Sequence, residues 1–207
     1  MKIIDNFIPK EYIDNLYNTI TYSNFEWFLH QSTIHRRNSI TDYTAGVVYD
    51  GKTQDSPQFV HPFFDEGEFH PFFDLVEPFK LYMEDHNIFP KRLIRIKANM
   101  MMREPDFPLN HYNTPHTDIK DIDSDKIYSL LYYLNDSDGD TFIFNEVGIT
   151  IPDKLTIAHR VTPKQGRAVI FKSNQFHASS PPIDSLKRMV INFVFEVKDG
   201  INDTELS

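Results

Sequence analysis

The sequence predicts a mainly β fold with flanking α-helices, namely a jelly roll (double-stranded β-helix) core with N-terminal helices packed on one sheet. After Pro90, strand-like segments and turns alternate at roughly 8–12-residue spacing, which is typical of a sandwich or jelly roll. Segments with helical spacing come before Pro90. The 207 residues are 40% hydrophobic and 25% charged, which fits a globular chain with a sizeable core. We therefore expect a single domain over 1–207, with a helical and strand support region at 1–91 and a catalytic core at 92–198.

Two helices are predicted in the N-terminal region. Apolar residues recur at helical spacing from Lys10 to about Thr21, and Pro9 stands where a first helical turn would begin. A second helical pattern runs from Phe69 to about His86, but Pro78 lies inside it and predicts a kink or a break. Short strands are expected near residues 2–8, 27–29 and 45–49.

The core strands are predicted in order along the rest of the chain. The segment from Leu93 to Met102 is a strand with an uncommon polar residue, Asn99. Asn135–Gly139 consists of turn-forming residues. The remaining strands are expected at residues 127–134, 141–144, 155–161, 167–172 and 187–197.

Composition excludes several classes of function. The net charge of −9 disfavours a general nucleic-acid binder, which needs a positive face, although it does not exclude a local basic patch. The absence of cysteine excludes disulfides, thiolate metal sites and cysteine nucleophiles, so a metal must be bound by His, Asp, Glu or backbone oxygen. We expect a cytoplasmic protein with no membrane partner, because the sequence shows neither a signal-peptide core nor an apolar run long enough to span a membrane.

The segment Asn113-Thr-Pro-His-Thr-Asp118 is the strongest candidate for chemistry. If it is extended, the side chains of His116 and Asp118 point to the same face. His177, on a distant segment just before a turn-forming stretch, could complete the set. Two imidazoles and one carboxylate on one side of a metal are typical of non-haem Fe(II) oxygenases.

Arg188 begins a second informative segment, which runs to Phe195. Met189, Ile191, Phe193 and Phe195 form one face of this predicted strand, while Arg188, Val190, Asn192 and Val194 form the other. Neither face is typical of a solvated surface, so the strand is buried and carries one guanidinium. A buried guanidinium requires an anionic partner, which a dicarboxylate could supply, unless the side chain reaches solvent at the strand end.

Taken together, His116-Thr-Asp118, His177 and Arg188 resemble the Fe(II)/2-oxoglutarate-dependent dioxygenase superfamily, in particular its prolyl 4-hydroxylase-like branch, which includes phage-encoded members. The resemblance covers about residues 92–197. Three further stretches resemble motifs of that branch: Leu131-Tyr-Tyr-Leu-Asn135, Gly139-Asp-Thr141, and Thr162-Pro-Lys-Gln-Gly166 followed by Ala168-Val-Ile-Phe171.

The resemblance implies a role for each matching residue. His116, Asp118 and His177 would bind Fe(II), and Arg188 would pair with the distal carboxylate of 2-oxoglutarate. Dioxygen would be the second co-substrate, with ascorbate as a candidate reductant. Further candidates for binding 2-oxoglutarate are Tyr133, Thr141, Asn99 and Tyr112.

Departures from the branch are also visible. Arg188 stands where prolyl 4-hydroxylases often carry Lys, and Asp140 replaces the second glycine of a turn. Asn113 occupies the place of a family tyrosine, so the role of the neighbouring Tyr112 is in doubt. Related halogenases lack the carboxylate that Asp118 provides, and its presence therefore favours hydroxylation.

Three hypotheses follow from these observations. The first is a hydroxylase acting on an unactivated C–H bond of a prolyl or other peptidyl residue, or of a small molecule. The second is a non-catalytic jelly-roll binding or structural module of virion type, in which the histidines are incidental. The third is a cupin-like metalloenzyme with another metal. Cupins usually supply three His and a carboxylate, whereas only two His are well placed in this sequence. The segments Gln31–Asp42 and Arg103–Pro115 are expected to face the substrate, because binding residues concentrate on loops.

Overall fold

The structure is a computed structural model that describes residues 1–22, 24–33, 55–65, 67–119, 125–148, 152, 154–198 and 201. The expected strand near residues 45–49 and most of the expected substrate-facing segment at residues 31–42 lie outside these ranges.

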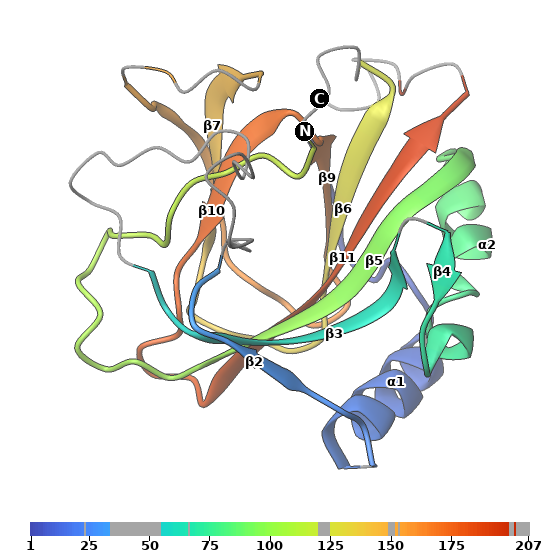
Figure 1. Cartoon of the computed structure of the whole chain (residues 1–207), viewed down its shortest axis with the longest axis horizontal. Coiled ribbons are helices and arrows are strands. Elements are labelled where there is room, and N and C mark those ends of the chain that lie inside the picture. The colour runs from blue at the N-terminus through green and yellow to red at the C-terminus, as the bar shows by residue number, and fades with distance from the viewer. Residues whose placement is uncertain are drawn as a thin grey trace.

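Two antiparallel sheets form the jelly roll that the sequence predicts (Figure 1). The major sheet has the order β1 (Lys2–Ile4), β9 (Ala168–Lys172), β6 (Ile127–Tyr133), β11 (Lys187–Val197), β5 (Pro90–Met102), β3 (Gln58–Asp65) and β2 (Phe28–His30), with β4 (Glu68–Phe69) beside β3. The minor sheet has the order β10 (Gln175–Ser179), β7 (Thr141–Val147) and β8 (Ile157–Val161).

Three strands, β3, β4 and β10, escape detection in the sequence. Strand β4 has only two residues, and β3 and β10 are irregular. Strand β3 contains Pro62, which cannot donate a ladder hydrogen bond, and its register with β5 shifts between Pro62 and Phe64. The register of β10 with β7 shifts between Gln175 and His177. Such irregularities interrupt the two-residue alternation by which a strand is recognised.

The helices cover the outer face of the major sheet (Figure 1). Helix α1 (Lys10–Tyr22) buries Ile13, Leu16 and Ile20 in the same apolar cluster as β6 and β11. The second expected helix, over residues 69–86, is wrong in extent. Its chain instead contains the last residue of β4, the 3-10 turn η1 (Phe73–Leu75) and α2 (Phe79–Asp85). Pro78 caps α2 at its N-terminus, and the break therefore falls at the proline, where it was expected.

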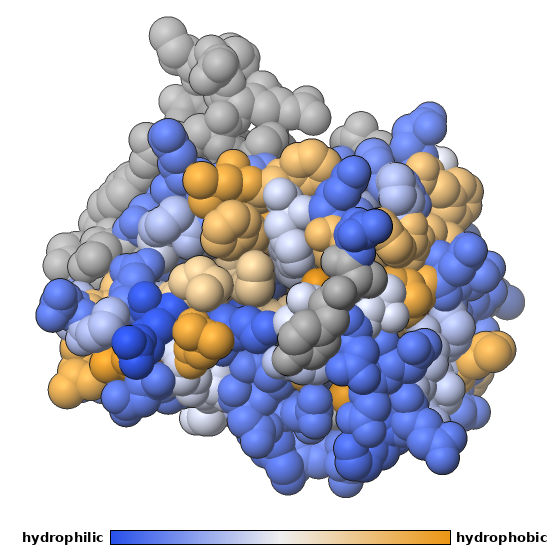
Figure 2. All heavy atoms as spheres, turned by 90° about the horizontal axis from the view of Figure 1, so that it is seen from below, coloured by the Kyte–Doolittle hydropathy of each residue, from blue (hydrophilic) through white to orange (hydrophobic). Residues whose placement is uncertain are grey.

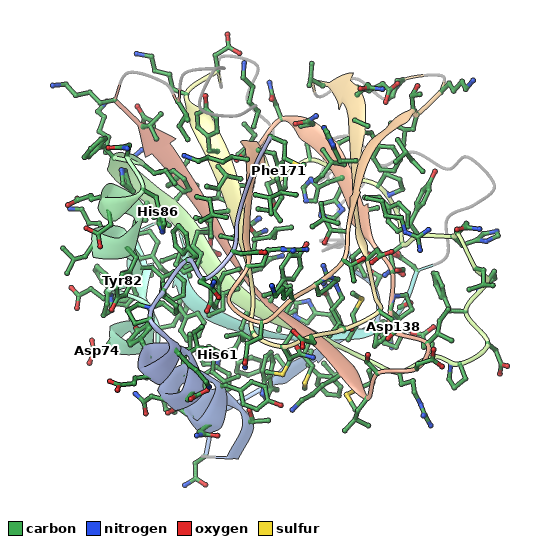
Figure 3. The ribbon with its side chains drawn as sticks, turned by 180° about the vertical axis from the view of Figure 1, so that it is seen from behind. His61, Asp74, Tyr82, His86, Asp138 and Phe171 are labelled. Carbon is green, nitrogen blue, oxygen red and sulfur yellow. The ribbon has the colours of Figure 1, made fainter. Side chains whose placement is uncertain are left out.

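A buried histidine, His61 of β3, packs against Phe25 and Phe63 of this cluster and is labelled in Figure 3. Its two ring nitrogens lie 2.7 Å from the carbonyl oxygen of Glu26 and 3.1 Å from that of Pro71. His61 therefore joins β3 to two neighbouring segments. Phe171 of β9, also labelled in Figure 3, belongs instead to a second apolar cluster that includes Leu131, Ile143 and Val190 and fills the space between the sheets.

Strand β11 determines which residues reach that space. Met189, Ile191 and Phe193 belong to the cluster beneath the helices, as the alternation of the sequence predicts. Arg188 and Asn192 line a cavity on the opposite face of the same strand. The central strand of the major sheet thus carries polar groups into the interior of the jelly roll.

The face of the molecule shown in Figure 2 is mostly hydrophilic, with apolar side chains scattered among the polar ones. Exposed apolar residues of the described chain include Leu29, Leu109 and Leu186. None of the described helices has the length and apolar character that crossing a membrane requires.

The turn between β6 and β7 is tied to the loop before β11 by a single carboxylate. Asp138, labelled in Figure 3, accepts hydrogen bonds of 2.9 Å from the backbone N–H groups of Ile183, Asp184 and Ser185. Burial would raise the pKa of Asp138, but these donors outweigh it and hold the pKa well below its usual range. The carboxylate therefore stabilises the start of β11, which carries Arg188.

We predict that Asp138→Ala lowers the free energy of unfolding by about 2 kcal/mol at neutral pH, because three backbone N–H groups lose a charged acceptor. Since folding lowers the pKa of Asp138, its stabilisation is present above the pKa of an unfolded Asp, about 3.9, and is lost as the pH falls towards the folded-state value. The difference in the free energy of unfolding between the variant and the wild type, measured with urea, should therefore narrow in acid. The control is Asp184→Ala, an exposed carboxylate in the same turn. Equal effects of the two variants on the free energy of unfolding would contradict the stabilising role of the Asp138 carboxylate.

Candidate active site

His116 lies beside His177 at the edge of the minor sheet that β10 forms. They form an isolated antiparallel bridge in which each backbone N–H donates to the other carbonyl at 2.9 Å. Asp118 follows with a bond of 2.9 Å from its N–H to the carbonyl of Ser173. The expected strand around His116 and Asp118 is thus only one bridge, yet these bonds still place both side chains beside His177.

Backbone carbonyls orient both imidazoles. Nδ1 of His116 lies 3.1 Å from the carbonyl oxygen of Thr114, and Nδ1 of His177 lies 3.1 Å from that of Gln175. A carbonyl oxygen can only accept, so Nδ1 carries the proton in each ring and Nε2 keeps its lone pair. This arrangement is the one by which metal-binding histidines are usually held.

Three side chains hold the carboxylate of Asp118, whose side chain is only 2% exposed. Arg95 of β5 donates to Oδ1 at 2.5 Å, and Ser129 of β6 donates to Oδ2 at 2.6 Å. Asn192 of β11 donates to both oxygens, at 3.1 and 3.2 Å. Three adjacent strands of the major sheet therefore fix the position of one acid.

The electrostatics keep all three groups in the form that binds a metal. Burial, together with the neighbouring His177, lowers the pKa of His116 to about 3. Burial likewise lowers the pKa of His177. Burial alone would raise the pKa of Asp118, but Arg95 and the two imidazoles outweigh it and lower the pKa well below its usual range. At neutral pH the site offers two neutral imidazoles and one carboxylate.

These three groups fit a single metal ion. Their ligand atoms all lie within 4.8 Å of one another, and Nε2 of His177 is 3.7 Å from Oδ2 of Asp118. Two imidazoles and one carboxylate match the donor set of non-haem Fe(II) sites, which leave other coordination positions open. His116 and His177 also line an interior cavity, so a bound ion would face space in which further ligands could be held.

Arg188 lines the same cavity and is only 3% exposed. Its Nε donates to the carbonyl of Gly139 at 2.8 Å, and its Nη2 donates to Oγ1 of Thr141 at 2.6 Å. Tyr133 donates its hydroxyl to the same Oγ1 at 2.7 Å, and its ring lies 5.6 Å from the guanidinium. Because Thr141 accepts both bonds, its hydroxyl proton is available to a further acceptor.

No carboxylate of the described residues lies within ion-pairing distance of Arg188. The nearest acid that influences its pKa, Asp140, is paired instead with Arg160. Burial lowers the pKa of Arg188, yet a guanidinium remains charged at neutral pH. A buried cation without an anion is costly, so the geometry favours an anionic ligand at this position.

The carbonyl oxygen that orients Arg188 belongs to Gly139, whose backbone is tightly packed. A Cβ at this position would lie 2.6 Å from the carbonyl oxygen of Ser180 and 2.9 Å from backbone atoms of Pro181 and Pro182. Only glycine fits between these strands without a backbone shift. This packing explains the glycine in the Gly139-Asp-Thr141 turn.

Of the other candidates from the sequence, the structure places Asn99 at the cavity and Tyr112 away from it. Asn99 lines the cavity, and its buried Oδ1 has no hydrogen-bond partner among the described residues, as expected of a group that awaits a ligand. Tyr112 does not line the cavity. It packs against Phe142 and Phe144, with ring centroids 5.2 Å apart in each pair. Asn113 instead ties its own loop to the segment just before β3, because its Oδ1 accepts the N–H of Ser56 at 2.8 Å.

Four residues around the site were not proposed as site residues from the sequence: Arg95, Lys97, Ser129 and Asn192. Arg95 and Lys97 alternate with buried Ile96 and Ala98 on β5, which signals one polar, inward face of a strand. Ser129 gives no comparable signal, because a small hydroxyl within an apolar strand is common. Asn192 shares the face of Arg188, and that shared face could have identified it.

The comparisons with known proteins agree with this geometry. Residues 106–196 match the family model of the 2OG-Fe(II) oxygenase superfamily. No curated protein sequence matches the chain. Among solved structures, the chain is similar to a prolyl-4-hydroxylase from Pseudomonas putida, with 15% identity, a TM-score of 0.52, and coverage of 95% of this chain and 92% of that one.

Two further structures show the same fold. One is a 2OG-Fe(II) oxygenase family oxidoreductase from Burkholderia pseudomallei, with 13% identity, a TM-score of 0.53, and coverage of 92% and 79% of the two chains. The other is the non-heme alpha ketoglutarate dependent epimerase SnoN from nogalamycin biosynthesis, with 11% identity, a TM-score of 0.57, and coverage of 94% and 77%. Residues 106–196, the part of the chain that is similar to the 2OG-Fe(II) oxygenase superfamily, carry both imidazoles, the carboxylate and the buried guanidinium.

Proposed function

We propose that this oxygenase is a hydroxylase, in which His116, Asp118 and His177 hold Fe(II) and Arg188 holds the distal carboxylate of 2-oxoglutarate. One observation carries the proposal: a buried guanidinium without an ion-pair partner among the described residues lines the same cavity as two metal-competent imidazoles. A dicarboxylate could bind the metal at one end and neutralise the guanidinium at the other. A structural module with incidental histidines would have no use for this cation, whose burial is destabilising.

The protein's own groups each have a defined task. Arg188 and the hydroxyl of Thr141 donate to the distal carboxylate, while Tyr133 fixes the hydroxyl of Thr141. The carbonyls of Thr114 and Gln175 keep Nε2 of the two histidines directed at the metal. Bound Fe(II) would supply the redox chemistry, by which 2-oxoglutarate, dioxygen and a C–H substrate give succinate, carbon dioxide and the hydroxylated product.

Asp118 supports hydroxylation as the outcome. Its carboxylate occupies the position that related halogenases leave to chloride, and Arg95, Ser129 and Asn192 hold it in place. The substrate that we propose carries an unactivated aliphatic C–H bond, as in a prolyl or other peptidyl residue or a small molecule. Similarity to a prolyl-4-hydroxylase and to an epimerase at such low identity describes the fold alone, so the reaction has to be measured.

We predict that anaerobic addition of Fe(II) and 2-oxoglutarate to the protein produces the weak visible charge-transfer band of an iron–keto-acid complex. His116→Ala should abolish the band and the release of succinate under air, because it removes one of three protein ligands. His159→Ala is the matched control, since His159 is exposed on β8. If His116→Ala retained a wild-type band, the metal assignment would be wrong.

Arg188→Met should weaken 2-oxoglutarate binding by about 2–5 kcal/mol, because a buried, hydrogen-bonded charge pair loses one partner. Titration of the same band gives the dissociation constant. Arg92→Met removes an exposed guanidinium that pairs with Glu196 at the far end of the major sheet, and should leave the constant unchanged. Unchanged affinity in Arg188→Met would exclude Arg188 as the carboxylate-binding residue.

Gly139→Ala tests the positioning of the guanidinium without changing any charge. The added Cβ must displace the backbone near Ser180 and Pro181, and the carbonyl that accepts from Arg188 should move with it. We expect lower stability in urea and a several-fold weaker affinity for 2-oxoglutarate. Gly67→Ala is a control for the affinity alone. Its φ of +97° means that alanine strains this turn and lowers stability, but no atom lies within 4 Å of the added Cβ and the affinity for 2-oxoglutarate should stay at the wild-type value. A normal 2-oxoglutarate affinity in Gly139→Ala would show that this carbonyl does not orient Arg188.

A further inference from the structure

A groove on the inner face of the major sheet adjoins the cavity of the candidate active site. Its volume is about 290 Å3, and strands β2, β3 and β5 form its walls. Gln58 and Lys97 line both the groove and the cavity that contains His116, His177 and Arg188. The two spaces are therefore neighbours that share a wall, and a molecule in the groove lies next to the metal site.

The groove combines apolar walls with two cations. Phe28, Val60 and Pro62 supply apolar surface, while Arg95 and Lys97 supply positive charge. Arg95 is already engaged by Asp118, at 2.5 Å. Lys97 differs, because no carboxylate of the described chain lies within 4.0 Å of its ammonium group.

The charges around Lys97 leave it unneutralised at short range. Asp65 lies opposite Arg95 in the pairing of β3 with β5, and both Asp65 and Asp118 attract the ammonium of Lys97 only from beyond ion-pairing distance. A metal bound by Asp118 would take up much of the charge of that carboxylate. Lys97 is partly buried, and its ammonium group is therefore less well hydrated than one on the open surface.

We infer that this groove is the substrate site and that Lys97 binds an anionic group of the substrate, namely a carboxylate. This inference rests on the proposed function. It narrows the substrate to a small acid with an apolar body, such as an N-acylated amino acid with a free carboxylate. The carboxylate pairs with Lys97, and the apolar part lies against Phe28, Val60 and Pro62 with a C–H bond directed towards the metal.

The size of the groove supports a small acid over a long peptide. Ligand pockets of about 300–1,000 Å3 enclose most of a drug-sized molecule, and this groove lies at the lower limit. One amino-acid residue with a short acyl group is of suitable size. Affinity for such a ligand would come from apolar contact, and Lys97 would provide selectivity for the charged end.

The test uses pairs of probes that differ only in charge, such as N-acetyl-L-proline, N-acetyl-L-leucine and N-acetyl-L-phenylalanine, each with its primary amide. Binding to the metal-free protein is followed by ligand-observed NMR, which is independent of turnover. We expect at least one acid to bind about tenfold or more tightly than its amide. Lys97→Gln should remove this preference and Lys97→Arg should keep it. Lys91→Gln, an exposed lysine on the same strand, should have no effect.

Each outcome decides the matter. The inference is overturned if no acid in the panel is preferred over its amide, or if Lys97→Gln keeps the preference. It is also overturned if Lys97→Gln loses the iron–2-oxoglutarate band while acid selectivity persists, because Lys97 would then serve the co-substrate. Failure of the proposed function has a different signature: the wild-type protein would form no band with Fe(II) and 2-oxoglutarate, whatever acids it binds.

Discussion

Buried charge is the constraint on which the rest of this structure depends. The jelly roll encloses a carboxylate, that of Asp118, and a guanidinium, that of Arg188, which do not pair with each other. Each needs compensation, because an uncompensated charge in a protein interior costs several kcal/mol. Asp118 receives it from three side chains of the major sheet, while Arg188 receives only neutral acceptors, Gly139 and Thr141. The fold thus neutralises its acid internally and leaves its cation for a ligand.

Strand β11 makes this arrangement possible, because it separates two environments. One face carries Met189, Ile191 and Phe193 into the apolar cluster beneath the helices, and the other carries Arg188 and Asn192 into the cavity. The helices stabilise the sheet from outside without touching the chemistry. The polar groups inside then lie on strands that are paired on both sides, which limits their motion and preorganises the site.

The sequence predicted the parts of the site that depend on local pattern. Alternation within one strand identified the face of Arg188, and the spacing of His116 and Asp118 predicted two neighbouring candidate ligands. It failed where distant segments meet. Strand β3 was missed because Pro62 interrupts its alternation, and Arg95 was missed because only the folded sheet brings β5 beside the loop of Asp118. Tyr112, one position from the family pattern, packs into an apolar cluster instead of the cavity.

The inner face of β5 shows both a local sequence pattern and its consequence in the folded sheet. Its residues alternate so that Arg95, Lys97, Asn99 and Met101 all point inwards, an unusual polar content for a central strand. Arg95 is committed to Asp118, and Met101 contacts Asn113. Lys97 and Asn99 remain, with an ammonium group and an amide oxygen that have no close partner of their own among the described residues. A strand that served only the stability of the sheet would carry apolar residues at these positions, so their polarity is best explained by the molecules that the cavity and the groove bind.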